Sequence, residues 1–178
     1  AQLHKGKSVI TITNGYDHNI YDYNIPLTDK FTLTYTGQIY NQQDPEKILI
    51  ALFTLINENE INKSDVILRF FGPSNWEVDK LIFKYHLQDL VELYEPIPPE
   101  DSIKKQKESQ LLLLLNWENR MQNGIYTQKI FDYLGARRPI LATGGYHNND
   151  VKEELINQTN AGKYCSTKEE IKSALLSY

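Results

Sequence analysis

The 178-residue sequence is poor in cysteine, in excess positive charge and in long hydrophobic runs. Its single cysteine, Cys165, excludes an internal disulfide and a dithiol redox motif. Its longest apolar run covers residues 111–115, far short of the roughly 20 residues that a membrane-spanning helix needs. A secretory signal pattern does not open the chain. From these absences we expect a cytoplasmic location.

Charge and motif content exclude several functional classes. The formal net charge of −4 leaves no broad basic surface to neutralise a nucleic acid, although a small anionic ligand needs only a few local cations. The sequence contains neither a G-x-G-x-x-G fingerprint nor a G-x-x-x-x-G-K-[ST] phosphate loop, and it lacks a serine nucleophile elbow. The histidines lack metal-ligand spacing; they are His4, His18, His86 and His147. We therefore expect no metal and no cofactor.

Apolar runs of strand length alternate with segments of helical periodicity. The predicted strands cover residues 8–13, 31–36, 66–71, 90–94, 110–115 and 140–143. The predicted helices cover residues 44–59, 75–86, 99–108, 127–135, 149–157 and 169–176, and residues 167–170 fit a capping box that starts the last one. This alternation predicts one α/β domain over residues 1–178, with a doubly wound, mainly parallel sheet and helices on both faces.

Glycine and polar residues gather where the predicted strands end. The carboxyl ends of strands form the ligand crevice of a doubly wound sheet, and glycine there lets a ligand approach the backbone. Gly37 and Gln38 follow the strand at 31–36, and Gly37 has the position of a phosphate-approach glycine. Strands also end in ordinary turns that favour glycine, so this pattern alone leaves both interpretations open.

Lys129 and Asp132 form the most informative pair in the sequence. Residues three apart share one helix face, so a cation and a carboxylate point together towards whatever lies beside the start of this helix. The backbone amides of Tyr126, Thr127 and Gln128 add hydrogen-bond donors there, and a helix N-terminus attracts anions. The pair could grip a diphosphate and two ribose hydroxyls. It could also be an ordinary solvated surface pair.

A tryptophan and an arginine follow the most apolar predicted strand. Trp117 could stack on a sugar or a base, and Arg120 could meet phosphate. Trp117 could equally cap the hydrophobic core. Arg137 and Arg138 follow a predicted helix, and they fit a solvated turn better than a ligand site.

Taken together, these segments resemble the C-terminal, donor-binding domain of GT-B glycosyltransferases, close to the retaining family 4 (group 1). The entry segment is VITITNGYD, and the opening strand with its glycine is FTLTYTGQIY. The next strands correspond to VILRFFGP, LVELYEPIPPED and SQLLLLLNW. The most specific match is TQKIFDYLGARRPILATGG, which is similar to the family signature K-x-x-E-Y-L-A-x-G-(R/K)-P-I-L. The resemblance implies a Rossmann-like fold that forms one half of a GT-B enzyme.

The resemblance also implies roles for individual residues. Asp132 stands where the family has the glutamate that binds the donor ribose, and Gly37 matches the glycine near the diphosphate. The turn at 124–128 would hold the diphosphate through backbone amides, with Lys129 adding charge and no metal required. The loop at 95–97, including Ile97, would line the base.

Several positions depart from the family pattern. Gln38 follows the first glycine where the family often has arginine, and residues 43–44 occupy the region of a family lysine. Gly124 replaces the first acid of the E-x7-E pair, and Arg137 replaces a signature glycine. Asp132, the residue expected to bind the ribose, is one methylene shorter than the usual glutamate. The charge of the phosphates must therefore be met by Lys129, by Arg120 or by backbone amides alone.

The length of the chain allows only half of a GT-B enzyme. The absent initiator Met indicates a fragment whose residues 1–25 form an interdomain entry segment, and we expect this fragment alone to be inactive. With its missing N-terminal domain it would be a hexosyltransferase that moves a sugar from a nucleotide-sugar donor to a glycan or lipid-linked acceptor, as in polysaccharide biosynthesis. Peripheral association with the inner face of a membrane stays open. The alternatives are a non-catalytic nucleotide-binding or interaction module and a GT-B nucleotide-sugar epimerase.

Overall fold

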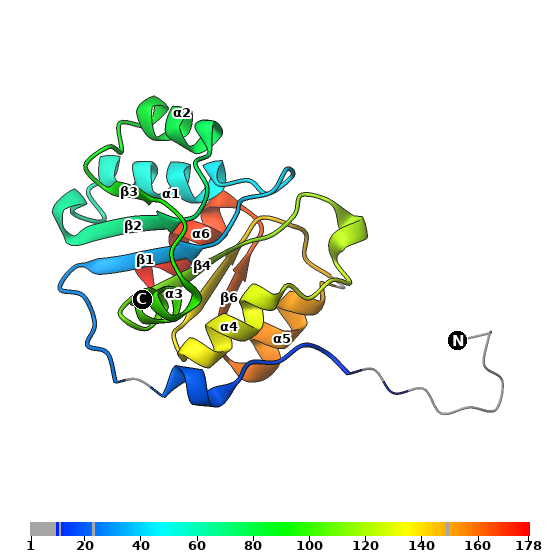
Figure 1. The fold of residues 1–178 in the computed structure, drawn as a ribbon. Coiled ribbons are helices and arrows are strands. Elements are labelled where there is room, and N and C mark those ends of the chain that lie inside the picture. The colour runs from blue at the N-terminus through cyan, green and yellow to red at the C-terminus, as the bar shows by residue number, and fades with distance from the viewer. Residues whose placement is uncertain (1–9, 11, 23, 149) are drawn as a thin grey trace.

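The computed structural model describes residues 10, 12–22, 24–148 and 150–178. Its framework is a six-stranded sheet in which every strand pair is parallel, in the order β3-β2-β1-β4-β5-β6 (Figure 1). The strands are β1 (Phe31–Thr36), β2 (Val66–Phe71), β3 (Val91–Tyr94), β4 (Leu111–Leu115), β5 (Ile140–Thr143) and β6 (Gly162–Cys165). The sheet is that of a Rossmann-like α/β domain, so the predicted fold class is confirmed.

Helices cover both faces of this sheet. The α-helices are α1 (Glu46–Asn57), α2 (Trp76–Lys84), α3 (Pro99–Lys107), α4 (Gln128–Ala136), α5 (Val151–Thr159) and α6 (Lys168–Leu176), with short 3-10 turns η2 (His18–Tyr21), η3 (Lys63–Asp65) and η4 (Arg120–Gln122). α1, α2 and α6 lie on one face, and α3, α4 and α5 lie on the other (Figure 1). Among the residues that the structure describes, none of the helices combines the length and apolar character of a bilayer span.

The five leucines of β4 explain why this strand lies at the centre of the sheet. Leu111, Leu113 and Leu115 belong to the core cluster under α1 and α6, whereas Leu112 and Leu114 belong to the cluster under α3, α4 and α5. Successive side chains of a strand point to opposite faces. A continuous apolar run therefore serves a strand that is buried on both sides.

The neighbouring strand β1 has one apolar face and one polar face. Its three threonines, Thr32, Thr34 and Thr36, are all buried and alternate with apolar residues. The hydroxyl of Ser109, just beyond α3, donates to Thr34 Oγ1 at 2.7 Å, and Gln106 Nε2 of α3 donates to Thr36 Oγ1 at 3.0 Å. These bonds satisfy polar groups that would otherwise be costly to bury. They form a polar seam between β1 and α3.

Most predicted elements agree with the structure. β1, β2 and β5 have the predicted bounds, and the six α-helices begin and end within about two residues of prediction, as is usual for element ends. The capping box is also present, because Thr167 Oγ1 accepts from Glu170 N while the Glu170 carboxylate accepts from Thr167 N. The strand β6 was not predicted, since it has only four residues and includes Gly162 and Lys163.

The described residues of the predicted strand at 8–13 do not form a strand. Ser8, Val9 and Thr11 lie outside the described residues, and residues 10, 12 and 13 are exposed and belong to no strand. The sequence there favours a strand locally, but a strand needs a hydrogen-bonded neighbour, and the edges of this sheet are formed by β3 and β6. The segment instead leads into η2, which contacts α4.

Candidate functional site

A groove opens at the carboxyl ends of β1 and β4, where the strand order reverses. Consecutive strands proceed from β1 to β3 in one direction and from β4 to β6 in the other, and ligands of such sheets bind at this switch point. The groove has a volume of about 550 Å³. Its lining includes eight residues that were singled out by name in the sequence as possible ligand contacts: Gly37, Gln38, Ile97, Trp117, Thr127, Gln128, Lys129 and Asp132.

Gly37 forms the floor of the groove directly after β1. Its φ of +102° lies in the left-handed region that favours glycine, and its N–H donates to Phe71 O at 2.7 Å. The next strand also ends in a glycine, Gly72, and a Cβ there would lie 2.4 Å from Gly37 O. The two strand ends therefore approach each other backbone to backbone. Gly37 is exposed and lines the groove, although its N–H is already bound to Phe71 O.

Lys129, the second residue of α4, reaches across to the end of β1. Its Nζ donates to Thr36 O and lies 4.0 Å from the ring centroid of Tyr35. Burial lowers the pKa of Lys129 from 10.5 to about 8, against the opposing effect of Asp132. An ammonium carries three N–H donors, so the bond to Thr36 leaves donors for an anionic ligand. Lys129 is therefore a partly desolvated cation beside Gly37.

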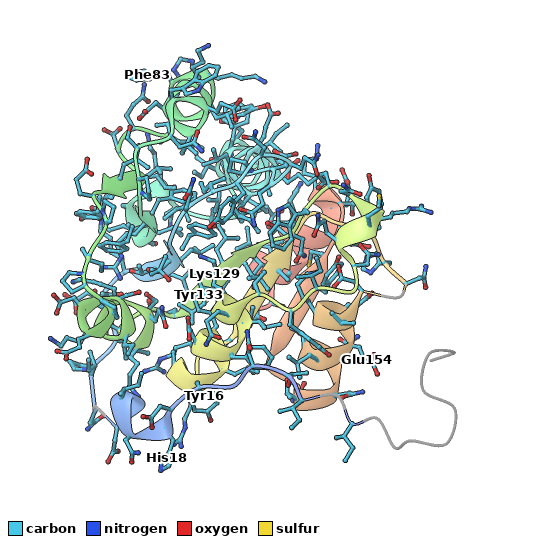
Figure 2. The ribbon with its side chains drawn as sticks, turned by 45° about the vertical axis from the view of Figure 1, so that its right-hand side comes forward. Tyr16, His18, Phe83, Lys129, Tyr133 and Glu154 are labelled. Carbon is cyan, nitrogen blue, oxygen red and sulfur yellow. The ribbon has the colours of Figure 1, made fainter. Side chains whose placement is uncertain are left out.

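Tyr133 fixes the same point of β1 from the next turn of α4. Its hydroxyl accepts from Thr36 N at 3.2 Å, so the carbonyl and the amide of Thr36 are both bound by side chains of α4. Figure 2 shows Lys129 and Tyr133 together on this helix. The fully buried ring raises the pKa of the Tyr133 hydroxyl, because ionisation there would leave a charge without solvent. Helix α4 and strand β1 are thus fastened together at the groove.

No ion pair joins Asp132 to Lys129 within the described residues, although the carboxylate acts to raise the pKa of the nearby ammonium. Asp132 Oδ1 instead accepts from Gln128 Nε2 at 3.0 Å. Lys129 and Asp132 are the charged side chains among the described residues that line the groove. They supply a cation bound to the end of β1 and a carboxylate one turn further along α4, as a ligand with an anionic part and a hydroxyl-bearing part requires.

Two buried polar atoms of the lining residues have no partner within the described part of the chain. Thr127 occupies the N-cap position of α4, yet its Oγ1 makes no capping bond. Gln106 Oε1 is the second, although the Nε2 of the same side chain is bound to Thr36 and Ser102. Buried polar atoms are normally satisfied. These two oxygens therefore mark positions where a ligand or water would complete the hydrogen bonding.

The loop at 38–45 is held against the end of β4 by Gln43. Gln43 Nε2 donates to Leu115 O at 2.8 Å, and Gln43 forms an antiparallel bridge with Trp117. Glu118 N donates to Gln42 O at 2.6 Å beside it. The uncharged Gln43 therefore orders this loop and adds no positive charge to the groove.

Two residues singled out in the sequence lie away from the groove lining. Arg120 is exposed in η4, with its guanidinium 5.0 Å from the ring centroid of Tyr146. Tyr126 packs on Phe131 with ring centroids 5.7 Å apart. The sequence reasoning missed Gln106, whose only signal was a polar residue on the sheet-facing side of a helix. Among the described residues there is no cluster of three or more acidic, His or Cys side chains suited to a metal ion.

No protein-family model matches the chain, and no curated sequence matches it. Several solved structures do match the chain. S. aureus TarM, determined as a mutant with Fondaparinux, alpha-GlcNAc-glycerol and UDP, matches with a TM-score of 0.70 and 12% identity over 99% of this chain and 33% of that one. WaaG, a glycosyltransferase involved in lipopolysaccharide biosynthesis, matches with a TM-score of 0.66 and 15% identity over 84% of this chain and 38% of that one.

A third match is itself a single domain. The C-terminal domain of a glycosyl transferase group 1 family protein, LpcC from Francisella tularensis, matches with a TM-score of 0.63 and 10% identity, over 90% of this chain and 86% of that one. The chain thus spans about a third of the TarM and WaaG chains and most of the LpcC domain. At these identities the likeness concerns the fold, and the chain has the fold of the C-terminal domain of GT-B glycosyltransferases.

Proposed function

We propose that this chain is the donor-binding domain of a retaining glycosyltransferase. The full-length enzyme would transfer a hexosyl group from a nucleoside diphosphate sugar to a glycan or lipid-linked acceptor, as in polysaccharide biosynthesis. The acceptor would bind through a further domain, because the chain corresponds to only about a third of the TarM and WaaG chains. The domain alone would bind donor and would not transfer sugar.

The observation that carries this proposal is the arrangement of Lys129, Thr127 and Asp132 around one groove. The Lys129 ammonium and the start of α4 offer positive charge and N–H donors to a diphosphate. The Thr127 hydroxyl, buried and without a partner among the described residues, has hydrogen-bonding capacity left at the helix start. The Asp132 carboxylate has acceptor capacity left for the two ribose hydroxyls, since within the described part of the chain only Oδ1 accepts a hydrogen bond.

The base would extend towards the loop after β3. Ile97 lines the main groove, and a smaller hollow of about 210 Å³ continues past Gly37 and Gly72 to Tyr94 and Glu95. The two spaces share Gly37, Gly72 and Pro73 as lining residues, so we expect the base and the diphosphate to occupy adjoining parts of one site.

The chemistry of this half-site is stabilisation of the leaving group. When the bond between the sugar C1 and the diphosphate oxygen breaks, the electron pair stays on the diphosphate and its negative charge increases. Fixed donors in a partly dry site stabilise such charge better than water does, because they need no reorganisation. Lys129 and the amides at the start of α4 would act in this way without a metal.

Calorimetric titration of the chain with UDP-, GDP- and ADP-sugars tests the proposal. We expect one of the three to bind, and Asp132→Ala to weaken that binding about tenfold or more, because it removes a charged hydrogen-bonding partner. Glu154→Ala is the matched control, since Glu154 is an exposed acid of α5 that also accepts from a glutamine, at 2.8 Å. The assignment fails if none of the donors binds and Asp132→Ala leaves kcat/KM of the full-length enzyme unchanged.

A further inference from the structure

The side chain of Gln128 makes two hydrogen bonds that link distant parts of the chain. Its Nε2 donates to Asp132 Oδ1 at 3.0 Å and to Gly15 O at 3.1 Å. Asp132 lies one turn further along α4, but Gly15 precedes Gln128 by 113 residues. The segment that contains Gly15 runs alongside α4, where Figure 1 shows it as the blue trace and Figure 2 labels its neighbour Tyr16.

The chemistry of the primary amide makes this link directional. The NH₂ group has two protons, and each is directed at one acceptor, a carboxylate on one side and a backbone carbonyl on the other. Rotation of the amide to follow one acceptor misaligns the other bond, because hydrogen bonds weaken steeply away from linearity. The positions of the Asp132 carboxylate and of the Gly15 peptide therefore depend on each other through Gln128.

We infer that Gln128 is a positioning residue that orients Asp132 for the donor and couples that carboxylate to the backbone of Gly15. Ligand binding in the groove would then shift the peptide group between Gly15 and Tyr16. The structural half of this inference depends only on the two hydrogen bonds. The functional half rests on the proposed donor site. It assigns to the Gln128 side chain a role separate from that of its backbone amide at the helix start.

A ligand-free double-mutant cycle tests the structural half. The readout is the NMR signal of the Tyr16 backbone amide, whose peptide plane contains Gly15 O. Asp132→Ala releases one partner of Gln128 and should shift this signal in the otherwise wild-type chain, but not in a Gln128→Leu background. The leucine retains the bulk of the side chain without its polar atoms, and position 128 is exposed, so the variant should fold. An equal Tyr16 shift in both backgrounds would overturn the coupling.

The control for this cycle uses a matching pair on α5. Gln158 Nε2 donates to Glu154 Oε1 at 2.8 Å, again four residues apart and exposed. Glu154→Ala breaks the same kind of bond on a different helix, and Figure 2 shows Glu154 apart from Tyr16. It should leave the Tyr16 signal unchanged. A Tyr16 shift as large as that of Asp132→Ala would mean that the readout is non-specific and would count against the coupling.

Titration with the best-bound nucleotide sugar tests the functional half. In the wild-type chain the Tyr16 signal should move along the binding curve. Gln128→Leu should weaken binding three- to tenfold and abolish the Tyr16 response, and in the full-length enzyme it should raise KM for the donor while kcat is retained. If no donor binds but the ligand-free cycle shows coupling, the proposed function fails and the Gln128 link stands. If a donor binds and Tyr16 responds equally in Gln128→Leu, the link fails and the donor site stands.

Discussion

Replacement of the buried ammonium by an apolar side chain of similar length, Lys129→Met, should remove one pH-dependent part of the domain's stability and impair its ligand binding. Burial holds the pKa of Lys129 at about 8, below its usual 10.5. The folded chain therefore bears the cost of a partly desolvated charge at neutral pH. Methionine removes that cost and also removes the cation that we assign to the diphosphate.

The pH dependence separates this effect from a simple change in packing. Below about pH 8 the folded and unfolded chains both hold the proton on Lys129, so the full cost of the buried charge is present. Between about pH 8 and 10.5 only the unfolded chain still holds it, so stability rises with pH. For the pKa values of about 8 and 10.5, wild-type stability should rise by about 2 kcal/mol between pH 7 and 9.5 relative to Lys129→Met.

Binding should change in the opposite direction over the same interval. If only the protonated form of Lys129 binds the diphosphate, the apparent affinity of the wild-type chain should fall about 30-fold between pH 7 and 9.5. The diphosphate is fully ionised throughout this range, so its own charge does not change. The Lys129→Met variant should bind weakly at both pH values.

Urea denaturation and calorimetric titration of both proteins at pH 7, 8 and 9.5 measure the two trends. Opposite slopes for wild-type stability and wild-type affinity, both absent in Lys129→Met, are the expected result. The reasoning is refuted if wild-type affinity is constant with pH, or if Lys129→Met binds donor as tightly as the wild-type chain.

Three further predictions concern the scaffold. Gly162→Ala should destabilise the domain by about 3 kcal/mol or more, because its Cβ would lie 1.9 Å from the Ile140 carbonyl, whereas Gly124→Ala, with open space around it, should shift the thermal midpoint little. Thr167→Ala should cost about 1 kcal/mol in urea denaturation by removing the capping box of α6. Hydrogen bonds to Glu153 and, to a lesser extent, to Glu170 raise the pKa of His147. The stabilising contribution of His147 should therefore be present below about pH 6.5 and be lost as the pH rises through the raised pKa. His147→Ala should lower the urea midpoint at pH 6 and change it little at pH 8.5.

The order of elements could be predicted because their patterns are strong. The leucines at 111–115 are apolar without interruption, as a strand buried on both faces requires. The strand β6 gave a weak pattern, since Gly162 and Lys163 contribute no apolar side chain and the strand lies at the sheet edge. Residues 10, 12 and 13 show the reverse, because the local preference of the sequence for a strand is not matched there by a neighbour in the sheet.

The site was predictable in position and unpredictable in orientation. Helical spacing placed Lys129 and Asp132 on one face of a helix, and both line the groove. Spacing could not show that Lys129 would bind the end of β1 while Asp132 would bind Gln128. The exposure of Arg120, and its stacking on a tyrosine, likewise depend on a loop whose path the sequence does not encode locally. Contacts between remote segments decide such details.

The polar seam between β1 and α3 gives the two faces of the sheet different tolerance to mutation. On the α1 side the core is apolar, and such cores accept volume-conserving exchanges among hydrophobic residues at a cost of less than about 1.5 kcal/mol. On the α3 side Thr34 and Thr36 depend on particular hydroxyl and amide partners, so even the near-isosteric change to valine leaves a buried donor or acceptor unmatched. Sequence drift in this domain should therefore be rapid under α1 and slow under α3, next to the groove.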